Sequence, residues 1–231
     1  MSEALTVSAL VLRRAEWRDY DRMVTLLTKE RGRVEAVVRG CRRSKSELKN
    51  AAEPFVCGRY QLFYSHERFT VTQYELTDGF IPLREDFDRL SMGAQWLRLL
   101  EKVSVEESPN PGLFDAAVTA LGFLAYSDVD LRLIDCMFLL KLCLYAGVAP
   151  SADRCALCGK SASSVTLRFS AEKGGCVCPS CAPKARPLSE GARRILFKAP
   201  RAPFKSAPLL EQSPFWQEAY ERARELAAGI V

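Results

Sequence analysis

The chain has 231 residues, 48% of them hydrophobic and 26% charged, which is typical of a globular protein with one large or two small domains. Its net charge of +5 favours polyanionic partners. No apolar leader resembles a signal peptide, and the most apolar stretch, residues 131–146, is too short and too charged to span a bilayer.

Residues 1–80 carry strand patterns and no helical periodicity. We expect five strands, at Thr6–Leu12, Arg22–Thr28, Val34–Val38, Phe55–Tyr64 and Phe69–Leu76. Five short strands in such a length predict a small closed barrel or a curled sheet. The only histidine, His66, falls in the turn before the fifth strand, and we expect it to be solvated and without a role.

A basic stretch lies between the second and fourth strands. Residues 31–49 hold seven cations against Glu35 and Glu47, a net charge of +5 that equals that of the whole chain: Arg31, Arg33, Arg39, Arg42, Arg43, Lys45 and Lys49. A solvated surface loop is one interpretation. We prefer phosphate binding, because small barrels bind single strands along one face.

Aromatic residues are plentiful in the same region, where one or two of them could stack on bases. They are Trp17, Tyr20, Phe55, Tyr60, Phe63, Tyr64, Phe69 and Tyr74. Alternation assigns most of these to the core, and the sequence does not single out the rest.

From Pro82 onward the pattern becomes helical. An apolar stripe follows the acids Glu85 and Asp86, a second helix is expected at Leu113–Tyr126, and a third at Val129–Tyr145, with Ser127-Asp128 as its N-cap region. The third helix is apolar on nearly every side, which predicts a buried central helix.

Two Cys-x-x-Cys pairs follow this helix, Cys155 with Cys158 and Cys178 with Cys181, separated by nineteen residues. That spacing is typical of a four-thiolate zinc site, which has a filled tetrahedral shell and a structural role. A redox dithiol or a disulfide pair is the alternative. Nine cysteines without a secretory signal favour a reducing cytosol, and Cys176 is either a spectator or a replacement ligand.

The remainder of the chain is basic again, and Arg193 and Arg194 are candidates for a second phosphate contact. Ser189 is expected to cap a helix through Phe197, and Pro200, Pro203 and Pro208 to impose an extended connector before a last helix at Phe215–Ala228. The predicted organisation is a barrel at 1–80, a helical domain at 81–150 and 183–231, and a zinc insert at 151–182.

Several ordered segments resemble the RecO family of bacterial recombination mediators. They are residues 9–13, 20–28, 32–34, 38–40 and 80–84, and the segment Cys155-x-x-Cys158-Gly…Gly174-Gly175-x-x-Cys178-x-x-Cys181. The resemblance implies an α+β protein, with an N-terminal OB-fold β-barrel followed by an α-helical domain that carries a four-cysteine zinc-finger insert. Cys176, an additional thiol, departs from the motif.

The resemblance also implies a function. It implies binding of single- and double-stranded DNA, annealing of complementary strands, partnership with RecR, and contact with single-strand-binding protein that lets RecA replace it. One structural zinc ion, no membrane partner and a cytoplasmic, nucleoid-associated location are expected. The basic loop carries over to Arg39, Arg42, Arg43, Lys45 and Lys49.

Two other functions were weighed. An RNA-binding or transcription-associated barrel with a zinc ribbon fits the residues equally well without the resemblance. A zinc deaminase does not fit, because Val177 rather than proline precedes Cys178, and Arg68 rather than glutamate stands two residues after His66. With no Walker loop and no hydrolase motif, we expect no catalysis.

Overall fold

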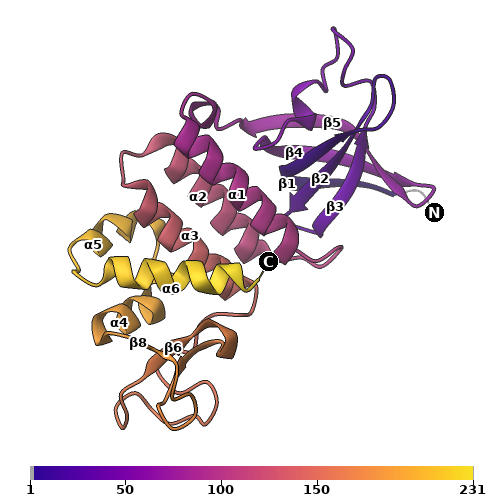
Figure 1. The fold of residues 1–231 in the computed structure, drawn as a ribbon. Helices are drawn as coiled ribbons and strands as arrows, with labels where there is room; N and C mark the ends of the chain where they lie inside the picture. Colours follow the sequence, from indigo (N-terminus) through magenta and orange to yellow (C-terminus); the bar gives the residue numbers. More distant parts are fainter. Residues whose placement is uncertain (1–2, 231) are drawn as a thin grey trace. The chain divides into compact units, whose positions relative to one another are not determined.

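The structure, a computed structural model, describes residues 3–230, which form two compact units divided between Ala125 and Tyr126. The first begins with five strands: β1 (Glu3–Glu16), β2 (Arg22–Thr28), β3 (Gly32–Val38), β4 (Cys57–Ser65) and β5 (Arg68–Asp78). They close into a barrel in the order β1-β2-β3-β5-β4, with β3 and β5 parallel (Figure 1). The predicted closed barrel is confirmed, and its topology is that of an OB-fold.

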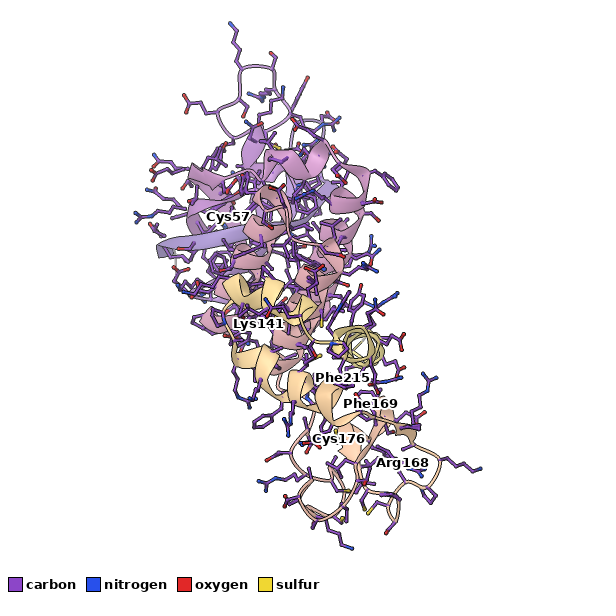
Figure 2. All side chains as sticks on the ribbon, turned by 90° about the vertical axis from the view of Figure 1, so that its left-hand side faces the viewer. Cys57, Lys141, Arg168, Phe169, Cys176 and Phe215 are labelled. Carbon is purple, nitrogen blue, oxygen red and sulfur yellow. The ribbon has the colours of Figure 1, made fainter. Side chains whose placement is uncertain are left out.

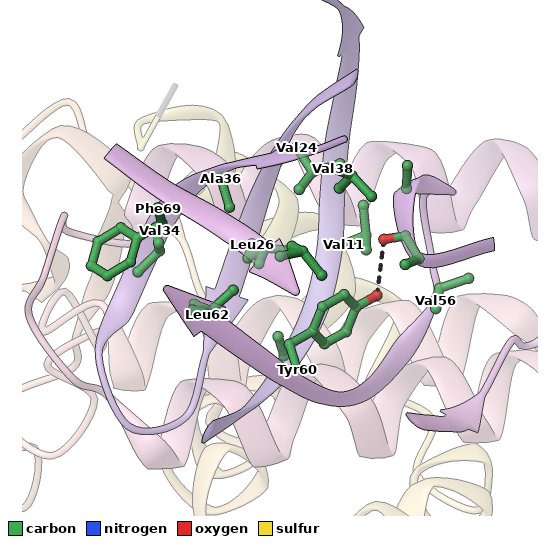
Figure 3. Close-up of a cluster of buried hydrophobic side chains, with 14 of the residues drawn as sticks. Val11, Val24, Leu26, Val34, Ala36, Val38, Val56, Tyr60, Leu62 and Phe69 are labelled. Carbon is green, nitrogen blue, oxygen red and sulfur yellow. Dashed lines mark hydrogen bonds between the residues drawn. The ribbon is translucent and has the colours of Figure 1, made fainter. Parts of the chain in front are cut away.

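Alternation along the strands builds the barrel core. On β4, residues Tyr60 and Leu62 are buried while their neighbours Arg59 and Gln61 are exposed. The Tyr60 side chain crosses the interior and donates a hydrogen bond of 3.1 Å to the carbonyl oxygen of Ala51 (Figure 3). Ala51 belongs to the short 3-10 helix η1 (Asn50–Ala52), so this bond fixes the end of the β3–β4 connection to the core.

Two helices complete the first unit, α1 (Phe87–Val103) and α2 (Pro111–Tyr126), and they run side by side in Figure 1. The 3-10 helix η2 (Ile81–Arg84) leads into α1, which is N-capped by Asp86. Gly93 allows α1 to approach the chain around Phe55, since a Cβ there would lie 2.9 Å from the Phe55 ring.

The second unit surrounds α3 (Leu131–Tyr145), in which ten residues are buried, as predicted for a central helix. The helices α4 (Glu190–Lys198), α5 (Ala207–Glu211) and α6 (Trp216–Ala228) belong to the same unit. The expected N-cap at Ser127-Asp128 is wrong. Asp130 caps α3 instead, because its carboxylate accepts the backbone N–H of Arg132 at 2.8 Å.

The prediction of an extended proline-rich connector is wrong. The connector forms two 3-10 turns, η4 (Ala199–Arg201) and η5 (Phe204–Ser206), before α5. Pro200 and Pro208 stand in the first turn of their helices, where a missing N–H leaves no bond unmade. Among residues 3–230, no helix has the length and apolar character needed to cross a bilayer.

Candidate nucleic-acid interface and metal centre

The four predicted ligand sulfurs come together in the second unit. The Sγ atoms of Cys155, Cys158, Cys178 and Cys181 all lie within 4.8 Å of one another, and those of Cys158 and Cys178 are 3.7 Å apart. A tetrahedron with metal–sulfur bonds of about 2.3 Å has edges of about 3.8 Å. The spacing therefore fits four thiolates around one metal ion.

Tight turns aim these sulfurs inward. After the first pair, Gly159 takes φ +73°, a left-handed conformation that glycine adopts without strain, and its N–H bonds the carbonyl of Cys155 at 2.9 Å. After the second pair, the N–H of Cys181 bonds the carbonyl of Cys178 at 3.1 Å. The backbone N–H of Cys178 also donates to the Cys155 sulfur at 3.3 Å, linking the two turns.

Backbone donors favour the ligating thiolate form of Cys155 and Cys178. Burial raises the pKa of Cys155, but N–H groups of Cys178, Cys158 and Leu157 lower that pKa to about 6. The N–H of Cys181 likewise lowers the pKa of Cys178. Hydrogen bonding to the Cys178 and Cys158 sulfurs raises the pKa of Cys181 to about 12, so metal binding has to release a proton there.

Cys176 lies outside the group of four sulfurs. It sits on β7 (Gly175–Val177), opposite Phe169 on β6 (Arg168–Ser170), and both side chains are buried in the small sheet that β8 (Arg186–Pro187) completes (Figure 2). Burial raises the pKa of the Cys176 thiol to about 12, which keeps it neutral. The geometry thus places Cys176 in the sheet interior.

The basic loop, residues 39–49, emerges from the barrel between β3 and η1 and extends beyond the strands at the top of Figure 1. Its backbone forms successive hydrogen-bonded turns, including Arg43 N–H to Gly40 O and Ser46 N–H to Arg43 O, both at 3.1 Å. The buried Cys41 side chain anchors its start. The loop is therefore a shaped projection with its cations outward.

The loop cations differ in how they are held. Arg39, Lys45 and Lys49 are exposed, and within residues 3–230 no carboxylate forms an ion pair with them. Arg42 pairs with Glu16 at 2.7 Å, and the Arg43 guanidinium lies over the Tyr20 ring at 5.2 Å. The first three are the cations most available to a phosphate.

Two of the predicted phosphate-binding cations, Arg31 and Arg33, are held by acids of their own unit. Arg31 pairs with Glu107 at 3.0 Å and Arg33 with Glu106 at 3.1 Å. Arg33 also donates to the carbonyl of Glu101 at 2.7 Å. These ion pairs are not predictable from the sequence, because the acids lie more than 70 residues downstream, in the segment between α1 and α2.

The second candidate pair lies on α4. Arg193 donates to the Ala152 carbonyl at 2.8 Å, which ties α4 to the start of the metal segment. Arg194 is exposed and pairs with Glu190 at 2.6 Å, one helical turn away. Arg193 is thus used in the architecture of the second unit, whereas Arg194 is reachable from solvent.

A groove of about 410 Å³ lies across β2 and β3, between the β1–β2 turn and the β4–β5 hairpin. Its apolar lining includes Trp17, Met23, Val34, Tyr64 and Phe69. At its rim the Arg68 guanidinium lies over the exposed Trp17 ring, 4.7 Å from its centroid. From the sequence alone, Trp17 is one of eight aromatic candidates for base stacking, and no pattern marks Arg68 as a site residue.

Comparisons with known proteins give one result. The family model described as "Recombination protein O N terminal" matches residues 1–80, and "Recombination protein O C terminal" matches residues 84–221. A "DNA repair protein RecO" from Alkaliphilus metalliredigens is 34% identical over 77% of this chain and 72% of the relative. One from Desulfatibacillum aliphaticivorans is 28% identical over 98% of this chain and 90% of the relative. On both grounds, this chain belongs to the RecO family of DNA repair proteins.

Proposed function

We propose that this chain is a non-catalytic recombination mediator that binds single- and double-stranded DNA and anneals complementary strands. With RecR, it would help RecA replace single-strand-binding protein during DNA repair. The observation that carries the proposal is the loop at 39–49, in which Arg39, Lys45 and Lys49 project from an OB-fold barrel without an acidic partner among the described residues.

Phosphate neutralisation supplies the mechanism. Two complementary strands repel each other through their phosphates, and a cation that contacts a phosphate releases condensed counterions. A flexible lysine or arginine on the loop can bind any sequence in this way, because the phosphate backbone carries no sequence information. Strands gathered on one basic projection pair with less repulsion, which is the requirement for annealing.

Zinc is the metal we propose for the four-cysteine cluster. Four thiolates at tetrahedral spacing are the donor set that zinc takes in structural sites, and they leave no open position for water or substrate. Cys155, Cys158, Cys178 and Cys181 would then stabilise a segment with few apolar residues of its own. The role proposed for the metal is thus structural, in agreement with a non-catalytic function.

The partners follow from family membership and not from any surface described above. RecR, single-strand-binding protein and RecA are those that the family implies, in a cytoplasmic, nucleoid-associated setting. Annealing of oligonucleotides coated with single-strand-binding protein, with and without this chain and RecR, tests that part directly. An unchanged annealing rate would contradict it.

Titration of a labelled single strand at several salt concentrations tests the DNA-binding proposal. For R39A/K45A/K49A we expect weaker binding to every sequence and a salt slope flatter by about 2, since each lost phosphate contact removes about 0.7. The matched control R59A/R98A/K102A removes three exposed cations from β4 and α1 and should bind like the original protein. Equal effects of both variants would contradict a specific role for the loop.

A competition experiment in the same format distinguishes a DNA-binding function from an RNA-binding function. Competition with an RNA strand of equal length at fixed salt should leave DNA bound. Displacement of DNA by RNA would instead favour an RNA-binding function and overturn the proposal.

A further inference from the structure

Two aromatic side chains of the β1–β2 turn are exposed although they are large. Trp17 is 41% exposed and Tyr20 is 53% exposed. Both stand in the five-residue connection between Glu16 of β1 and Arg22 of β2. An indole and a phenol that are each about half exposed on one short turn leave aromatic surface that a ligand could cover.

Each ring is held by an arginine from a different loop. Arg68 of the β4–β5 hairpin lies 4.7 Å from the centroid of Trp17, and Arg43 of the basic loop lies 5.2 Å from that of Tyr20. A backbone hydrogen bond of 3.1 Å from Arg42 to the Tyr20 carbonyl joins the turn to the basic loop. The rings are therefore oriented before any ligand arrives, which reduces the entropy lost on binding.

The surroundings give a direction to a bound strand. On one side of the turn lies the groove of about 410 Å³, whose lining holds the carboxylates Glu35, Glu67, Glu106 and Glu107 against the guanidinium groups of Arg33 and Arg68. With four acids against two bases, the groove is less favourable to phosphates than the basic loop. On the other side lies the basic loop, with Arg39, Lys45 and Lys49 exposed. On this arrangement, a strand that crosses the turn would have its phosphates toward the loop and its bases toward the rings and the groove.

We propose that Trp17 and Tyr20 form a stacking platform for unpaired bases, with Arg68 and Arg43 fixing the rings. This inference rests on the proposed function and adds which side chains contact bases rather than phosphates. Stacking is tolerant of sequence because every base has a π-face, whereas a paired base is not accessible to a ring. The platform would thus favour single strands over duplexes, which phosphate contacts alone do not.

Tryptophan fluorescence reports the contact directly. The chain has three tryptophans, and Trp96 and Trp216 are 1% and 8% exposed, so quenching by a bound oligonucleotide comes from Trp17. We expect an oligothymidine to quench the emission and an abasic strand of equal length and charge to quench it much less. Equal quenching by both strands would overturn the platform.

Affinity measurements give the second readout. W17A/Y20A should bind a normal single strand roughly 5- to 150-fold more weakly per lost base contact, with an unchanged salt slope and an unchanged affinity for the abasic strand. W17F/Y20F retains both rings and should retain affinity. The control F87A removes a ring that is 82% exposed on α1 and should have no effect.

The failures are distinguishable. If the original protein binds neither strand, the proposed function fails and the platform with it. If it binds normal and abasic strands equally, or if W17A/Y20A binds like the original protein, only the platform fails. In that case the exposed Trp17, Tyr20 and Arg43 would suit a protein interface, where these residue types are enriched.

Discussion

The guanidinium of Arg33 lies 3.1 Å from the carboxylate of Glu106. The same segment returns Glu107 to Arg31 at 3.0 Å, so two acids cover two arginines, one just before β3 and one on it, that we proposed as phosphate contacts. Both glutamates are exposed, and exposed ion pairs are weak, commonly below about 1 kcal/mol. A polyanion can therefore compete with them for the two arginines.

Neutralising these acids should strengthen DNA binding. For E106Q/E107Q we expect a higher affinity for single strands and a salt slope steeper by up to about 1.4, if both freed arginines contact phosphates. Salt titration of the complex measures both quantities. E85Q/E172Q removes the same charge elsewhere and serves as the control; an equal gain there would mean that only net charge matters.

Removing any one of the four clustered cysteines should release the metal. For C158S we expect loss of close to one zinc ion per chain and unfolding of the metal segment, because three thiolates no longer close the shell. Elemental analysis and thermal unfolding measure the two effects. C176A should retain its zinc, because this thiol lies outside the cluster; metal loss in C176A would contradict the assignment.

The Tyr60 hydroxyl should contribute measurably to stability. In Y60F the buried carbonyl of Ala51 loses its donor, which costs about 1–3 kcal/mol of unfolding free energy. Urea unfolding measures it. Y74F provides the comparison. The Tyr74 and Tyr60 ring centroids are 5.7 Å apart, but Tyr74 is only half-buried, so Y74F should lower the unfolding free energy by less. Equal costs would exclude the proposed role of the bond.

Lys141 should make stability depend on pH. Its ammonium is buried on α3, bonds the Pro200 carbonyl at 3.1 Å and lies over Phe204, and burial lowers its pKa. Between the folded and unfolded pKa values the unfolded chain binds more protons. The original protein should therefore gain stability relative to K141M as pH rises toward the unfolded value.

Urea unfolding between about pH 7 and pH 10 measures that difference. K205M removes an exposed lysine of the same unit and serves as the control for the loss of one charge. A difference between the original protein and K141M that stays constant with pH, or one that equals the K205M difference at every pH, would contradict the role of the buried ammonium.

The barrel and the cysteine cluster were accessible from sequence because both depend on local signals. Alternation at Val7, Ala9 and Val11 places one face of β1 inside, and two-residue gaps between cysteines form turns with few alternatives. The α3 cap was misplaced by two residues because Asp128 and Asp130 are both plausible caps. What distinguishes them is the hydrogen bond that the Arg132 N–H donates to the carboxylate of Asp130.

Contacts between distant segments were not accessible. Nothing in the sequence around Arg31 and Arg33 indicates that Glu107 and Glu106 return to them. Likewise, no pattern pairs Trp17 with Arg68, since the barrel closure that brings the two turns together depends on the register of all five strands. Counting charges along the sequence therefore located the basic stretch. It did not show which cations of that stretch remain free of acidic partners and available to a phosphate.

The segment that carries Glu106 also pairs with β3 through its backbone. The Arg33 N–H bonds the Val105 carbonyl at 3.1 Å, and the Glu107 N–H bonds the Arg33 carbonyl at 3.2 Å. Because β3 pairs with β5 only at Ala36–Val38, these bonds cover an edge that the barrel leaves open. An open strand edge is a template for aggregation, so this short return segment protects the protein from edge-to-edge polymerisation when many copies crowd together.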